Sequence, residues 1–184
     1  MIRRVSALFL LFPILSFAAA PAWKIVPTES HLTFTATQNG APANGEFKKF
    51  SGDIQFDPDQ LNSSSVKIVI DIGSVYDSYN QLADTLKTTD WFNLKVFPQA
   101  IFQSKKISKI GDKAYQAEGM LTIRDKTLPV TLTFNQQEYS STKAVMKGKT
   151  VIKRTAFGVG QGEWADTKAI KDDVQIDFIV SAIK

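Results

Sequence analysis

Residues 66–72 read VKIVIDI, and this stretch decides the fold class. Its four apolar residues Val66, Ile68, Ile70 and Ile72 occupy every second position, and a lysine and an aspartate lie among the residues between them. Successive side chains of a β-strand point to opposite faces of the sheet, so this alternation predicts a strand with one apolar and one polar face. A helix would instead need apolar residues three and four positions apart.

The same period of two recurs along most of the chain. Alternating segments follow at 32–36, 47–56, 101–107, 115–124, 127–134, 145–154 and 174–183. Turn residues separate them, and the stretch QNGAPANG at 38–45 predicts a turn between the first two strands. Roughly eight short strands with intervening turns predict an all-β fold, either a sandwich or an up-and-down barrel.

One segment, SYNQLADTLK at 78–87, breaks this pattern. Tyr79, Leu82 and Leu86 recur at helical spacing, and Ser78 with Gln81 three residues later matches a capping box. We therefore expect one short helix inserted into an otherwise antiparallel sheet.

The first twenty residues have the order of a secretory signal peptide. Arg3 and Arg4 precede an apolar run at 5–17, and small residues end it at Ala18 and Ala20. Residues 1–20 are therefore predicted to be a signal peptide cleaved after Ala18 or Ala20. The expected mature protein is a single domain over residues 21–184, located in the periplasm.

The composition excludes several classes of function. The chain has no cysteine, so disulfides, a thiol nucleophile and thiolate metal sites are excluded. Its 22 Lys and Arg residues face 18 Asp and Glu, and removal of the two signal arginines leaves 20 against 18. This balance gives no argument for nucleic acid as a partner. His31 is the only histidine and lies on a predicted strand, so we expect no catalytic residue, metal or cofactor.

The aromatic residues are the feature that these exclusions leave unexplained. Of 13 phenylalanines, ten follow the signal segment, together with all three tryptophans. The stretch TLKTTDWFNLKVFPQAIF at 85–102 concentrates four aromatic side chains where the predicted helix returns to the sheet. An eight-stranded barrel can be filled by its side chains or hold one small ligand. From composition alone, a filled core and a ligand pocket are equally supported.

Five sequence blocks carry a resemblance to a known family. They are GEFKKFSGDIQFDP at 45–58, SVKIVIDIGSV at 65–75, DTLKTTDWFNLKVFPQAIFQS at 84–104, GMLTIRDKTLPV at 119–130 and RTAFGVG at 154–160. From Trp23 to the last strand, the chain resembles the YceI-like family of exported, lipocalin-like barrels, which includes polyisoprenoid-binding proteins. The resemblance implies an eight-stranded antiparallel lipocalin-like barrel with a short helical insertion near residues 78–92.

The resemblance also implies an elongated apolar cavity that takes an isoprenoid or fatty-acid-like chain. The positions that match the family's apolar pattern, and from which ligand contacts are expected, are Phe34, Phe47, Phe50, Phe56, Ile70, Leu82, Leu86, Trp91, Phe92, Phe97, Phe102, Leu121, Ile123 and Val130. Four polar residues are candidates for contact with a ligand head group: His31, Asp84, Arg124 and Arg154. For the two arginines, surface charge or pairing with a carboxylate is the alternative interpretation.

The expected function is non-enzymatic binding, transport or sequestration of a polyisoprenoid or other long-chain lipid. The alternative is a filled barrel that acts as a partner of a membrane cytochrome through an exposed apolar patch. An enzyme acting on a lipid-linked substrate is a third hypothesis, and the residue inventory supports it least. A homodimer is compatible with each of these hypotheses.

Overall fold

The computed structural model describes residues 19–78 and 81–184. Its strands are β1 (Ala22–Ile25), β2 (His31–Gln38), β3 (Ala41–Phe47), β4 (Phe50–Gln55), β5 (Ser65–Asp71), β6 (Val75–Tyr76), β7 (Gln99–Gly111), β8 (Ala114–Ile123), β9 (Lys126–Tyr139), β10 (Lys143–Lys153) and β11 (Asp173–Ile183). One α-helix, α1 (Gln81–Lys87), and five 3₁₀ turns complete the described part. Most of the predicted signal peptide, residues 1–18, and Tyr79 of the predicted helix lie outside the described residues.

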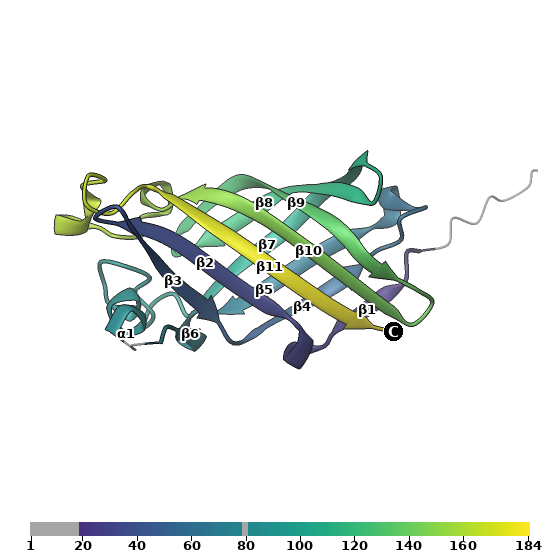
Figure 1. Cartoon of the computed structure of the whole chain (residues 1–184), viewed down its shortest axis with the longest axis horizontal. Coiled ribbons are helices and arrows are strands. Elements are labelled where there is room, and N and C mark those ends of the chain that lie inside the picture. Colours follow the sequence, from purple (N-terminus) through teal and green to yellow (C-terminus); the bar gives the residue numbers. More distant parts are fainter. Residues whose placement is uncertain (1–18, 79–80) are drawn as a thin grey trace, which may run out of the picture.

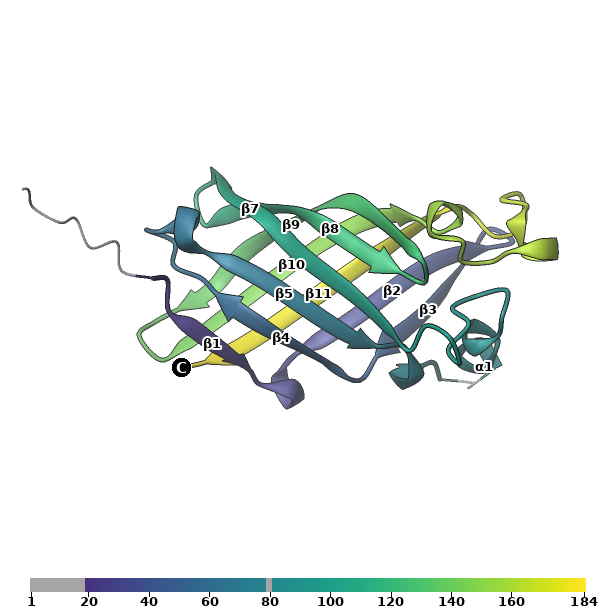
Figure 2. The same cartoon turned by 180° about the vertical axis from the view of Figure 1, so that it is seen from behind.

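The strands form a closed, eight-stranded antiparallel barrel (Figures 1 and 2). The ring runs β1-β4-β5-β7-β8-β9-β10-β11, and β1 pairs with β11 to close it. Three of the eight barrel strands are each divided into two labelled segments. β1 is continued by β2, β4 is the continuation of β3, and β5 is continued by β6. Each of these eight barrel strands pairs with the next along the chain. The alternating pattern left a sandwich and a barrel open, and the barrel that the family resemblance implied is confirmed.

Serine side chains complete the closing seam where the 3₁₀ turn η1 (Pro27–Glu29) separates β1 from β2. The Ser181 N–H donates to Ser30 Oγ at 3.0 Å, and the Ser30 hydroxyl donates to the Ser181 carbonyl at 3.2 Å. The Ser181 hydroxyl donates to Glu29 at 2.8 Å, and Lys143 pairs with the same carboxylate at 2.9 Å. The hydrogen bonds from Lys143 and Ser181 lower the pKa of Glu29 from its ordinary value. Side chains thus replace ladder bonds that the turn removes.

The first hairpin corrects the predicted turn at 38–45. The turn is only Asn39-Gly40, with φ of 50° and 80°, and β3 starts directly after it at Ala41. Asn-Gly is the preferred pair of a two-residue type I′ hairpin turn, and Gln38 pairs with Ala41 across it. In such a hairpin, the pair that closes the turn is hydrogen-bonded, and the next pair, which here includes Pro42, is not. Proline, which has no N–H, therefore removes no hydrogen bond between β2 and β3. Gly, Asn and Pro here therefore belong mainly to a strand.

The helix and two long connections lie at one end of the barrel. Figure 1 shows α1 and the β10–β11 loop (154–172) at the end opposite the C-terminus. The predicted helix is confirmed at Gln81–Lys87, with Ala83 and Leu86 buried. Asp77 Oδ1 accepts the Ala83 N–H at 3.1 Å and so fastens the first turn of the helix. Within the described ranges, no helix has the length and apolar character needed to cross a membrane.

Candidate ligand-binding cavity

The barrel encloses a cavity of about 810 Å³. This volume falls within the roughly 300–1,000 Å³ that is usual for small-molecule sites. Inward side chains of the barrel strands line it along its length, and α1 and the β10–β11 loop close over one end. Most of these side chains are apolar, because the inner face of each strand carries the hydrophobic half of the alternating pattern.

The end of the barrel opposite α1 is filled by an aromatic plug, which consists of Trp23, Phe56, Tyr115, Phe134 and Tyr139. Ring centroids lie 5.4 Å apart for Trp23 and Tyr139 and 5.5 Å apart for Tyr115 and Phe134. The Trp23 indole donates to the Phe56 carbonyl at 2.8 Å, and burial raises the pKa of both tyrosines. Filled core and ligand pocket therefore coexist: this end is packed, and the cavity occupies the rest of the barrel.

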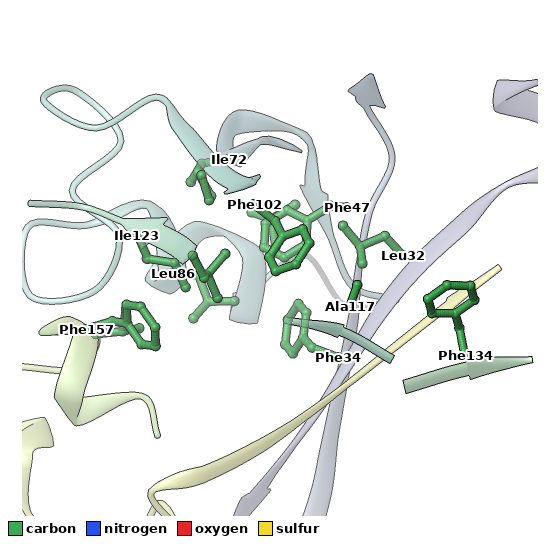
Figure 3. Packing of buried hydrophobic residues seen from close by; sticks show 14 of the residues in the cluster. Leu32, Phe34, Phe47, Ile72, Leu86, Phe102, Ala117, Ile123, Phe134 and Phe157 are labelled. Atoms are coloured by element: carbon green, nitrogen blue, oxygen red, sulfur yellow. The ribbon is translucent and has the colours of Figure 1, made fainter. Parts of the chain in front are cut away.

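Aromatic rings from different strands also line the cavity nearer to α1. Phe34, Phe47 and Phe102 come from β2, β3 and β7, and Figure 3 shows them gathered around one region of the interior. The centroids of Phe34 and Phe47 lie 5.7 Å apart, and Phe92 packs edge-on against Phe47 at 6.0 Å. The stretch at 85–102 thus contributes Trp91, Phe92 and Phe102 to the wall and cover of the cavity.

Gly45 keeps the Phe34 ring against the barrel wall. The two residues face each other across the β2–β3 pair, and a Cβ atom at position 45 would overlap the tip of the Phe34 ring. The Gly45→Ala variant should therefore turn this ring into the cavity and weaken ligand binding about tenfold. The measurement is titration with a fluorescent lipid. Gly111→Ala is the matched control, because a Cβ there meets only Ala114 at 3.4 Å. Equal affinities for the two variants would contradict this role.

The cavity reaches the surface at a mouth beside α1. Five lining residues are exposed, and they define this mouth: Gln38, Pro42, Asn44, Ser78 and Gln81. The first three belong to the β2–β3 hairpin and the other two to the segment that begins α1. One edge of β3 pairs with β2, and on its other edge only Glu46 and Phe47 pair with β6. The opening therefore lies beside the N-terminal part of β3, where this second edge pairs with no described strand.

The structure places eleven of the fourteen expected apolar contact residues around the cavity. These are Phe34, Phe47, Phe56, Ile70, Leu82, Leu86, Trp91, Phe92, Phe102, Leu121 and Ile123. Phe50 and Val130 instead pack against the core cluster without lining the cavity, and Phe97 lies beneath Arg124 with 5.6 Å between the guanidinium carbon and the ring centroid. None of these three lines the cavity, and their contact with a ligand stays a prediction.

Two of the four head-group candidates lie on the outer surface. His31 is exposed and its Nδ1 lies 3.2 Å from Glu46 Oε1 on the outside of the β2–β3 pair. Asp84 is exposed on α1 and lies 3.5 Å from Lys87. Neither lines the cavity, because each occupies the polar face of its element.

Arg124 holds the segment that covers the cavity. It adopts a left-handed conformation with φ of 55° at the β8–β9 turn, and its Nη1 donates to the carbonyls of Thr89, at 2.9 Å, and Trp91. The guanidinium also lies over the Phe97 ring. Arg124 therefore contacts the chain on both sides of Phe92 and is a positioning residue outside the cavity lining.

Arg154 does line the cavity, but its donors are occupied. Its side chain is 2% exposed and donates five hydrogen bonds of 2.8 to 3.4 Å, all to main-chain carbonyls. The acceptors are the carbonyls of Val159, Gly160, Asp166, Ile170 and Lys171. Burial lowers the pKa of this guanidinium, and the nearby Asp172 carboxylate opposes the shift. The residue is neither a surface charge nor the partner of a carboxylate: it fixes the β10–β11 loop.

Several lining residues escaped the sequence analysis. Val159, Trp164 and Ile170 come from the β10–β11 loop, which has no strand period and gave no signal of an inward face. Ile176 and Phe178 of β11 lie on the inner face of an alternating strand, so periodicity alone could have found them. Within residues 19–78 and 81–184, no group of three or more His, Cys, Asp or Glu side chains is arranged to hold a metal.

Similar proteins share both this sequence pattern and this barrel. The UPF0312 protein of Pseudomonas putida is 25% identical over 162 residues, which cover 85% of this chain and 79% of the relative. The crystal structure of Burkholderia cenocepacia BcnA has a TM-score of 0.81 and 34% identity over 85% of this chain and 98% of that chain. A polyisoprenoid binding domain from Saccharophagus degradans, 15% identical, shares the fold with a TM-score of 0.70 over 88% and 98%. The family model of the YceI-like domain matches residues 23–182, and the chain therefore belongs to the YceI-like family.

Proposed function

We propose that this protein is a non-enzymatic periplasmic carrier or sequestering protein that binds the chain of a polyisoprenoid or other long-chain lipid inside its barrel. The observation that carries the proposal is the apolar cavity of about 810 Å³ with a mouth at the protein surface. A chain can enter at the mouth and lie along the axis as far as the aromatic plug.

The energetics of the cavity suit an apolar chain. Burial of each methylene group contributes about 0.8 kcal/mol before the cost of ordering the chain. A lipid with a dozen or more buried carbons can therefore bind without any polar recognition. The cavity wall offers aliphatic and aromatic side chains over nearly its whole length, which is the surface that such a chain requires.

The comparisons support the proposal at two levels. Family membership and the likeness to BcnA support the same barrel. The Saccharophagus degradans domain is described as polyisoprenoid binding, and we extend that ligand class to this chain as part of the proposal. Export to the periplasm rests on the predicted signal peptide alone.

The proposal is tested by analysis of what the protein carries and what it accepts. Organic extraction of protein purified in native form, followed by mass spectrometry, should release a lipid with a long apolar chain. Protein stripped of lipid should then bind a fluorescent fatty acid with a Kd in the micromolar range or tighter, about −8 kcal/mol. Repeated extraction of no lipid, together with no binding of the probe, would refute the proposal.

The alternative of a cytochrome partner requires a filled barrel, and the barrel contains a cavity. The larger exposed apolar side chains of the described residues lie in different parts of the chain: for example, Ile110 is on β7, Val151 is on β10, and Val96 is in the connection from α1 to β7. A membrane cytochrome partner and a homodimer therefore stay predictions without a structural observation in their favour.

A further inference from the structure

The polar residues of the cavity gather at its α1 end and are mostly uncharged. Four of the five mouth residues carry an amide or hydroxyl side chain: Gln38, Asn44, Ser78 and Gln81. Asn44 shares the outer face of the β2–β3 pair with Glu46, and its Oδ1 already accepts the Thr35 hydroxyl at 2.8 Å. The side chains of Gln38, Ser78 and Gln81 can donate and accept hydrogen bonds where a lipid head group would rest if its chain fills the barrel. This end of the cavity therefore decides which head group is accepted.

No cation of the described residues is available there to bind an anionic head group. Lysine is absent from the described lining, and Arg154 directs all five of its N–H groups to main-chain carbonyls. Arg124 lies outside the lining and donates to the segment that covers it. The buried Trp91 Nε1 has no acceptor among the described residues, but it also has almost no accessible surface. A phosphate or carboxylate would thus lose its hydration without gaining charged donors.

A carboxylate lies at the same end of the cavity. Asp77 lines the cavity, is 8% exposed, and precedes α1, whose Ala83 N–H it accepts. Of the described carboxylates, it is the one that lines the cavity. Because water screens a buried charge only weakly, Asp77 repels a second negative charge at short range.

Building on the proposed function, we infer that the cavity selects lipids with an uncharged, hydrogen-bond-donating head group, such as a long-chain alcohol or amide. Lipids that end in a phosphate or carboxylate are rejected. The chain supplies affinity, the mouth amides and hydroxyls receive the head group, and Asp77 acts as a specificity-determining residue against anions.

The test compares two ligands with the same chain. Lipid-free protein is titrated with geranylgeraniol and with geranylgeranyl phosphate, each by displacement of a bound fluorescent lipid. The alcohol is expected to bind at least about tenfold more tightly than the phosphate. Asp77→Asn should reduce this difference several-fold by strengthening phosphate binding, because asparagine keeps an acceptor for the Ala83 N–H and removes the charge. Asp84→Asn, which makes the same change on the exposed face of α1, should leave the difference unchanged.

The outcomes separate the inference from the proposed function. If neither compound binds, the proposed function is wrong. If both bind with equal affinity to the wild-type protein, the lipid-binding function stands and the head-group inference is overturned. A selectivity that Asp77→Asn does not alter would overturn the role of Asp77. The role of Asp77 is supported if the difference in affinity between alcohol and phosphate is several-fold smaller in Asp77→Asn and unchanged in Asp84→Asn.

Discussion

Ala117→Phe is expected to fold normally and to lose most of its lipid binding. Ala117 is 2% exposed, lines the cavity from β8 and faces inward between its cross-strand partners Ile107 and Leu132. A phenyl ring here would occupy space that an apolar chain needs. If it displaces about four methylene groups, the loss is roughly 3 kcal/mol, or about a hundredfold in Kd. Because the ring enters an existing void, the strain of overpacking should be small.

The measurement pairs ligand titration with thermal unfolding. Glu118→Phe is the control, because it places the same ring on the exposed face of the same strand, one residue away. This control should bind lipid as the wild-type protein does. Unchanged affinity in a well-folded Ala117→Phe variant would show that the chain does not occupy the barrel interior.

The barrel strands were predictable because each has one face toward the cavity or core and one toward water. The alternation of Val66, Ile68 and Ile70 with the residues between them shows which face of β5 is apolar, and the same alternation marks the apolar faces of β7 to β11. The hairpin at 38–45 was harder, because composition suggested a long turn. Only the first Asn-Gly pair turns, and the second lies in β3 at Asn44 and Gly45. The register in which β3 pairs with β2 decides which Asn-Gly pair forms the turn, and this register depends on residues outside the pair itself.

The cavity itself was only partly predictable. Large apolar residues such as Phe34 and Phe102 follow from the strand pattern and from the family resemblance. The space they surround depends equally on small residues such as Gly45 and Ala117, whose inward position is invisible in hydrophobicity. Polar residues were the least predictable: Asp77 is one of several scattered carboxylates in the sequence, and its place there indicates only a turn or helix cap. The environment of a charged side chain is set by distant segments of the chain.

Arg154→Met is expected to be the most destabilising of the substitutions considered. Methionine fills a similar volume but donates no hydrogen bond, so five carbonyls of the β10–β11 loop, three of them in buried hydrogen bonds, lose this partner. Each unsatisfied buried group costs about 1–3 kcal/mol, and partial opening of the loop to water limits the total to roughly 3–5 kcal/mol. The midpoint of thermal unfolding should fall by roughly 10 °C. The interaction with the Trp91 ring, 5.7 Å from the guanidinium carbon, is lost as well.

Two further variants identify the cause of this loss. Lys153→Met removes the neighbouring exposed cation, which pairs with Asp173 on the surface, and should cost less than about 1 kcal/mol. Arg154→Lys keeps the charge but has fewer donors and no planar fork, so it should lie between the wild-type protein and Arg154→Met. If charge alone mattered, Arg154→Lys would match the wild-type protein in urea unfolding. If the carbonyl network matters, the loss of stability follows the number of donors, since only the guanidinium can reach five carbonyls of one loop at once.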